Sequence, residues 1–142
     1  MEDQVLSIER MLHLKELGVD TNKASMCWSK IVDREFPKLI GSCYLISYDN
    51  KCQSNKSYEI TPVFTLIDIM NLLPRYFHAY DMSFYLNIAP GGECNLLWVV
   101  SYRTNADIKF DTIHLTFSKK VIDAAYEMLC WVIENGYLEI KK

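Results

Sequence analysis

Three histidines and five cysteines are the residues of this chain best suited to acid–base, nucleophilic or metal chemistry. The histidines, His13, His78 and His114, form no His-x-x-x-His pair, so their spacing predicts no metal site. The cysteines form no Cys-x-x-Cys pair, and their odd number argues against a complete disulfide framework. They are Cys27, Cys43, Cys52, Cys94 and Cys130. A Cys–His nucleophile pair would form only if the fold brought two of them together. The sequence therefore predicts no catalytic, cofactor-binding or metal-binding residue.

A Pro-Gly-Gly-Glu stretch at residues 90–93 has two alternative interpretations. A phosphate-binding loop would need a lysine and a following helix, and this stretch has neither. It separates two runs rich in β-branched and aromatic residues, 83–89 and 94–102, which predicts a β-hairpin. If Gly91 and Gly92 are the turn, Tyr85 lies directly opposite Trp98.

The predicted hairpin carries the candidate interaction residues. Neither of its faces is polar, so both faces must be covered, by helices of the same chain or by a partner. The aromatic pair either packs beneath a helix or belongs to a partly exposed contact patch. The candidate protein-interaction residues are Tyr85, Leu96, Trp98 and Tyr102.

Three helices are predicted to flank this hairpin. Each follows a Ser or Thr that can accept hydrogen bonds from free N–H groups, and each ends at a glycine or proline. The ranges are 8–17, 65–73 and 119–135, with Ser7, Thr65 and Ser118 as caps and Gly18, Pro74 and Gly136 as terminators. Residues 104–117 fit either a strand or a loop. We therefore expect a single α+β domain over residues 1–142, with an antiparallel sheet centred on the hairpin at about 83–102.

Composition narrows the range of functions. Half of the 142 residues are hydrophobic, which is enough for a sizeable core. Fifteen basic against eighteen acidic residues give a net charge of -3, which argues against general nucleic-acid binding. The sequence contains no apolar run of about 18 residues and no signal peptide at its start, so we expect a cytoplasmic protein without a membrane span.

Three stretches taken together suggest a relationship. They are Leu-Lys-Glu-Leu-Gly-Val-Asp at 14–20 with Trp28, Phe-Thr-Leu-Ile-Asp-Ile-Met-Asn-Leu-Leu-Pro at 64–74, and Met-Leu-Cys-Trp-Val-Ile-Glu-Asn-Gly-Tyr at 128–137. In this order they resemble small uncharacterised proteins encoded in the genomes and prophages of Bacteroides-type gut bacteria. The resemblance implies an intracellular accessory protein and supplies no catalytic residue.

Two classes of function follow as hypotheses. The first is a non-enzymatic intracellular interaction or accessory module that acts through an apolar-aromatic surface, with a second copy or another protein as its partner. The alternative is a small-molecule-binding domain or an enzyme whose polar site forms only in the fold. Neither hypothesis calls for a cofactor.

Overall fold

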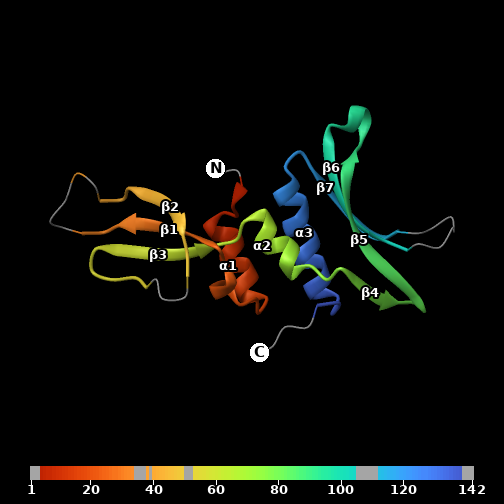
Figure 1. Ribbon diagram of the computed structural model, residues 1–142, viewed down its shortest axis with the longest axis horizontal. Helices are drawn as coiled ribbons and strands as arrows, with labels where there is room; N and C mark the ends of the chain where they lie inside the picture. Colours follow the sequence, from red (N-terminus) through yellow and green to blue (C-terminus); the bar gives the residue numbers. More distant parts are fainter. Residues whose placement is uncertain (1–3, 34–37, 39, 50–52, 105–111, 139–142) are drawn as a thin grey trace. The chain divides into compact units, whose positions relative to one another are not determined.

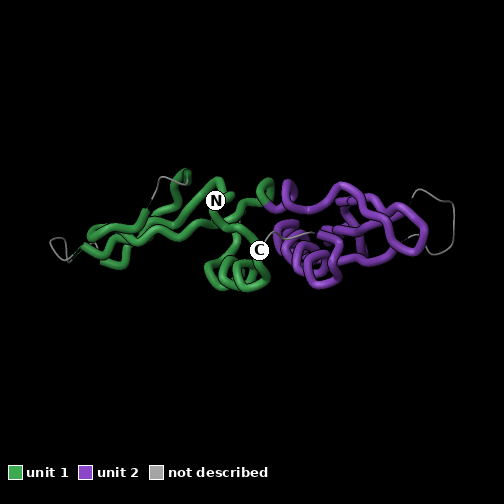
Figure 2. The backbone as a smooth tube through the Cα atoms, turned by 90° about the horizontal axis from the view of Figure 1, so that it is seen from below, with its two compact units in different colours: residues 1–68 green, residues 69–142 purple. Residues whose placement is uncertain are grey.

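The computed structural model describes residues 4–33, 38, 40–49, 53–104 and 112–138. Its chain divides into two compact units, residues 1–68 and 69–142, which Figure 2 shows in different colours. Each unit contains one antiparallel sheet, and the predicted α+β class is confirmed. The expectation of a single domain over the whole chain stays a prediction, and each unit is described by itself.

The first unit contains a three-stranded sheet in the order β2-β1-β3 (Figure 1). Its strands are β1 (Met26–Ile31), β2 (Cys43–Ser47) and β3 (Tyr58–Val63). β3 is an edge strand, and this position tolerates Pro62 because an edge strand pairs on one side only. Helix α1 (Ile8–Glu16) and a short 3₁₀ turn (Thr21–Lys23) precede the sheet.

Helix α1 begins and ends where the sequence predicts. The Ser7 hydroxyl accepts a hydrogen bond from the Arg10 N–H at 3.3 Å. At the other end Gly18 has a φ of 97°, and the Val19 N–H donates to the Leu14 carbonyl at 3.0 Å. The helix thereby buries Met11 and Leu14. The core of this unit also contains Leu6, Val19, Ala24, Cys27, Val63 and Phe64.

The second helix, α2 (Leu66–Leu72), has the predicted Thr65 cap and starts with a pair of reciprocal hydrogen bonds. The Thr65 hydroxyl accepts from the Asp68 N–H at 3.2 Å, and the Asp68 carboxylate accepts from the Thr65 N–H at 2.9 Å. The same carboxylate oxygen accepts from the N–H and the hydroxyl of Ser25 at 3.0 and 2.8 Å. Asp68 therefore fixes the start of α2 to the residue just before β1.

The second unit contains a four-stranded antiparallel sheet, β4-β5-β6-β7, and helix α3 (Figure 1). Helix α3 (Val121–Glu134) packs against β6 and β7. The strands are β4 (Tyr76–Ala79), β5 (Met82–Gly91), β6 (Leu97–Arg103) and β7 (Thr112–Ser118). The sequence left residues 104–117 as either strand or loop. The structure shows a strand from Thr112 onward, and residues 105–111 lie outside the described residues.

The ends of α3 follow the prediction at one end only. At its C-terminus Gly136 has a φ of 76°, and the Tyr137 N–H donates to the Val132 carbonyl at 2.9 Å, as expected. At the N-terminus the cap position is Lys120, and the Ser118 hydroxyl accepts from the Lys120 N–H at 3.4 Å instead of capping the helix itself. The core of this unit contains Ile69, Leu73, Phe77, Phe84, Val100, Tyr102, Ile122, Ala124, Ala125, Met128, Leu129 and Val132.

The predicted hairpin is confirmed between β5 and β6, but its turn is longer than the Gly-Gly pair. Gly91 belongs to β5 and pairs with Leu97, so the turn comprises residues 92–96. Gly92, Cys94 and Asn95 all have positive φ, which lets the chain reverse over five residues. Within the strand, position 91 favours glycine because a Cβ there would lie 2.6 Å from a Val99 methyl.

This longer turn changes the register of the hairpin. Tyr85 pairs with Arg103 and Trp98 pairs with Pro90, so the predicted Tyr85–Trp98 pair is wrong. Because side chains alternate between the two faces of a strand, the new register places Tyr85 and Trp98 on opposite faces of the sheet.

Candidate functional site

One face of the four-stranded sheet is covered by α3. Phe84 and Val100 are buried there. The Thr116 hydroxyl on β7 donates to the Ala124 carbonyl of α3 at 2.6 Å. The His114 imidazole stacks on the Trp131 indole of α3, with ring centroids 4.4 Å apart. This face is therefore the core of the second unit.

Tyr102 belongs to that covered face and not to a contact patch. Its exposure is 0%, and its hydroxyl donates to the Pro74 carbonyl at 2.7 Å. The Phe77 ring lies 4.7 Å from its ring. Burial also raises the pKa of the Tyr102 phenol well above its usual range. The prediction that Tyr102 is part of a surface patch is wrong, because α3 packs against the face of β6 that carries it.

The other three candidate residues are exposed, but the fold does not bring them together. Tyr85 lies on the face opposite α3. Trp98 is on the α3 side, paired with Pro90 at the end of the sheet, and is 39% exposed. Leu96 is in the turn and is 72% exposed. No single patch therefore contains all four predicted residues.

The face opposite α3 forms a different apolar surface, which we call the open face. Its register places Ala89, Val99 and Phe117 side by side on three neighbouring strands. Phe117 is 59% exposed, and Leu115, two residues before it on β7, is also exposed. The apolar residues of the open face are Tyr76, Tyr85, Ala89, Leu97, Val99, Leu115 and Phe117. The same register places Asn87 and Ser101 on this face, between Tyr85 and Ala89 along β5 and beside Leu115 on β7.

The open face could be found only in part from the sequence. Alternation along residues 113–117 indicates that Leu115 and Phe117 share a side of a strand. Which β5 and β6 side chains join them depends on the register of the hairpin. That register follows from the five-residue turn, so the sequence reasoning placed Tyr85 with Trp98 instead of with Phe117.

A hydrogen-bonded Ser–His pair lies on the β4–β5 hairpin, on the same side of the sheet as the open face. The Ser83 hydroxyl is 2.7 Å from the His78 Nδ1, and the two residues are direct cross-strand partners. The Tyr76 ring stands at an angle of 73° to the imidazole, 5.8 Å away. This pair is exposed to solvent. It is best explained as a polar margin of the open face.

Four of the five cysteines lie in the described part of the chain, and they differ in exposure. Cys27 is buried, Cys43 and Cys94 are exposed, and Cys130 is half-buried. Within the described ranges, no three His, Cys, Asp or Glu side chains gather closely enough to hold a metal ion.

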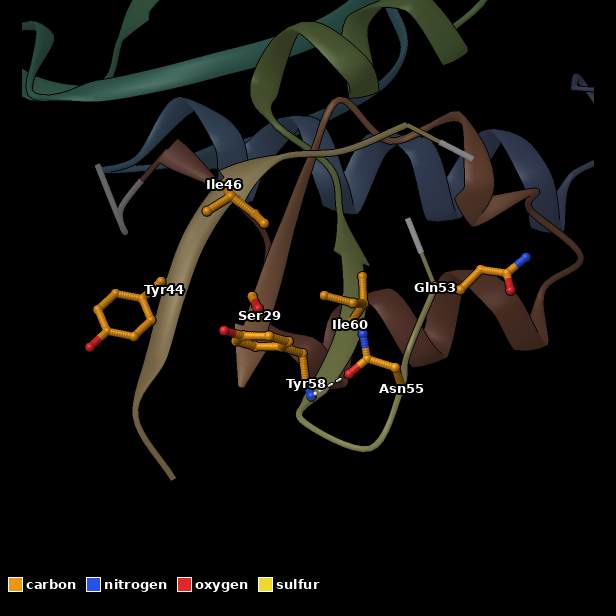
Figure 3. A pocket seen from close by; sticks show the side chains of 7 residues that line it. All are labelled: Ser29, Tyr44, Ile46, Gln53, Asn55, Tyr58 and Ile60. Atoms are coloured by element: carbon orange, nitrogen blue, oxygen red, sulfur yellow. Dashed lines mark hydrogen bonds between the residues drawn. The ribbon is translucent and has the colours of Figure 1, made fainter. Parts of the chain in front are cut away.

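A second surface is an open groove on the three-stranded sheet of the first unit (Figure 3). Its volume is about 430 Å³. Ser29 on the central strand β1 lies between its partners Tyr44 on β2 and Ile60 on β3. The groove is lined by Ser29, Tyr44, Ile46, Gln53, Asn55, Tyr58 and Ile60. No sequence motif predicts this groove. Its lining depends on how three strands pair, and therefore on which of their residues face the same side.

The rim of the groove is held in place by hydrogen bonds. The Asn55 side-chain oxygen accepts from the N–H groups of Ser57 and Tyr58 at 2.8 and 2.9 Å, and Figure 3 shows the second of these bonds. The Ser54 hydroxyl accepts from the Ile60 N–H at 2.9 Å. The segment before β3 therefore folds back against that strand and positions Asn55 and Tyr58 at the groove.

Comparison of the chain with models of protein families, with curated proteins and with solved structures finds no match. Among the helices of the described residues, none has the length and apolar character needed to cross a membrane. The open face and the groove are thus the two features on which a function can be argued.

Proposed function

We propose that the chain is a protein-interaction module and that the open face is its contact surface. The observation that supports this most strongly is the exposure of Phe117, Leu115 and Tyr85 on one sheet face. Burial of such side chains yields about 25 cal/mol per Å² of apolar area, which favours covering them. Contiguous exposed apolar patches commonly mark binding surfaces.

A second copy of the chain is the partner that we propose for this face. An apolar surface is complementary to itself, and a two-fold symmetric dimer uses the same patch on both subunits. Two sheets pack face to face at a spacing of about 10 Å, which lets side chains such as Phe117 and Val99 interdigitate. Arg103 pairs with Tyr85, so a charged side chain stands at the margin of the patch, as is typical of interface rims.

Light scattering over a range of protein concentrations tests this proposal. We expect the wild-type mass to rise with concentration toward that of two chains. Phe117→Gln should weaken the association about tenfold or more, because a central aromatic side chain often contributes well over 1 kcal/mol to binding.

The matched control is Leu96→Gln, which also replaces an exposed apolar residue but lies in the turn, outside the open face. It should associate as the wild type does. Equal masses for all three proteins at every concentration would contradict the proposal. Circular dichroism of each variant establishes that the fold is retained.

A further inference from the structure

The groove of the first unit contains a polar side chain without a partner. Ser29 is only 7% exposed, and its hydroxyl makes no hydrogen bond to any residue in the described part of the chain. Every fully enclosed side-chain nitrogen or oxygen of the described residues does have a partner, so the Ser29 oxygen must reach solvent through the groove that it lines. A hydroxyl held in this way favours a hydrogen-bonding atom supplied from outside the protein.

The walls around this hydroxyl are aromatic and aliphatic. In Figure 3 the Tyr58 ring extends from β3 past Ser29 toward β2, where Tyr44 lies. Ile46 and Ile60 complete the apolar lining on either side of Ser29. Such walls suit a flat apolar body, because aromatic rings stack and aliphatic groups pack against ring faces.

The polar groups of the groove indicate the charge of its ligand. The seven lining residues in the described part of the chain include no Asp, Glu, Lys, Arg or His. A charged ligand would lose its hydration without gaining an opposite charge, whereas a neutral one would lose little. The volume of about 430 Å³ lies within the range of pockets for small molecules.

We propose that this groove binds a small, neutral, planar aromatic molecule whose single polar group hydrogen-bonds with the Ser29 hydroxyl. The ring packs against Tyr58, Ile46 and Ile60, and the polar group supplies the hydrogen-bond partner that the described residues do not give to Ser29. This binding is separate from the proposed association of chains, because it uses a different sheet and different residues.

Titration of the ¹⁵N-labelled chain with indole, followed by amide chemical shifts, tests the proposal directly. Indole is planar, neutral and has one N–H donor. We expect saturable shifts at Ser29, Tyr44 and Tyr58, with a dissociation constant on the order of 1 mM for so small a ligand. Indole-3-acetate and tryptamine, which carry opposite charges, should both bind more weakly. Shifts confined to the second unit, or no saturation, would overturn the proposal.

Two variants separate the hydrogen bond from the apolar walls. Ser29→Ala should weaken indole binding about fivefold, the loss expected for one hydrogen bond, while the matched control Ser83→Ala in the second unit should have no effect. Tyr58→Leu should weaken binding more than Tyr58→Phe, because only the leucine removes the ring. Equal affinities of the wild type and Ser29→Ala would overturn the role of Ser29. If Ser29→Ala does not fold, the wild-type shift map and the tyrosine pair still decide whether the groove is the site.

Discussion

The imidazole of His114 stacks on the indole of Trp131, with ring planes only 2° apart and centroids 4.4 Å apart. His114 is on β7 and Trp131 is on α3, so the stack joins the sheet to the helix that covers it. On the neighbouring strand Tyr102 is the cross-strand partner of His114. A titratable ring thus lies at the junction of the main elements of the second unit.

Acidification should weaken the fold through His114. Burial lowers the pKa of its imidazole below the ordinary value, so the folded state favours the neutral ring more than the unfolded state does. The resulting stabilisation is complete above the unfolded pKa of about 6.5 and declines as the pH falls through that value toward the folded pKa.

Urea unfolding at a series of pH values from about 7.5 to 5 measures this effect. The wild type should lose more stability over that range than His114→Gln, which cannot titrate at this position. Identical pH dependence of the two proteins would show that His114 does not contribute.

Removal of the Tyr102 hydroxyl should destabilise the second unit. Tyr102→Phe keeps the buried ring against Phe77 but leaves the Pro74 carbonyl without the hydrogen bond of 2.7 Å. We expect a loss of about 1–2 kcal/mol in the free energy of unfolding. Tyr85→Phe removes an equivalent hydroxyl from an exposed ring and should change stability by less than about 0.5 kcal/mol. Urea unfolding of both variants would contradict this account of Tyr102 if their losses were equal.

The β4–β5 turn should be open to stabilisation. Tyr80 and Asp81 have φ values of 51° and 60°, and Ala79 pairs with Met82 on either side of them. Two-residue turns with two positive φ values favour Asn-Gly, because other side chains are strained in that conformation. The double substitution Tyr80→Asn, Asp81→Gly should raise the unfolding free energy by about 1 kcal/mol.

The control for this turn is Tyr80→Ala, which removes the exposed side chain without relieving the strain. It should bring no gain in thermal or urea stability. A double variant less stable than the wild type would mean that the Tyr80 side chain contributes more to the fold than its backbone strain costs.

Local signals in the sequence sufficed to predict most helix ends. Ser7 and Thr65 act as caps and Gly136 adopts a positive φ as expected, because each role depends on the residue and its immediate neighbours. The same reasoning failed at Ser118, where Lys120 takes the cap position. The choice between adjacent starting points of a helix depends on how α3 meets the sheet, which a local pattern does not contain.

The sites were less predictable, since they depend on register. Cys94 and Asn95 both adopt left-handed backbone conformations, and this lengthens the hairpin turn. Asn tolerates this conformation well, but Cys gives no sign of it in the sequence. A change in register of one residue moves every side chain of a strand to the other face. Here the partner of Tyr85 moved by five residues, from Trp98 to Arg103, and this odd shift separated Tyr85 from Trp98. The groove around Ser29 arises in the same way, from three strands whose pairing no single segment specifies.

An isotope-filtered NOE spectrum of an equal mixture of ¹³C-labelled and unlabelled chains tests the open face most directly. The dimer proposed here predicts cross-peaks between chains that involve the side chains of Phe117, Leu115 and Val99. Cross-peaks between chains that arise only from residues outside the open face, or none at concentrations where light scattering detects association, would contradict it.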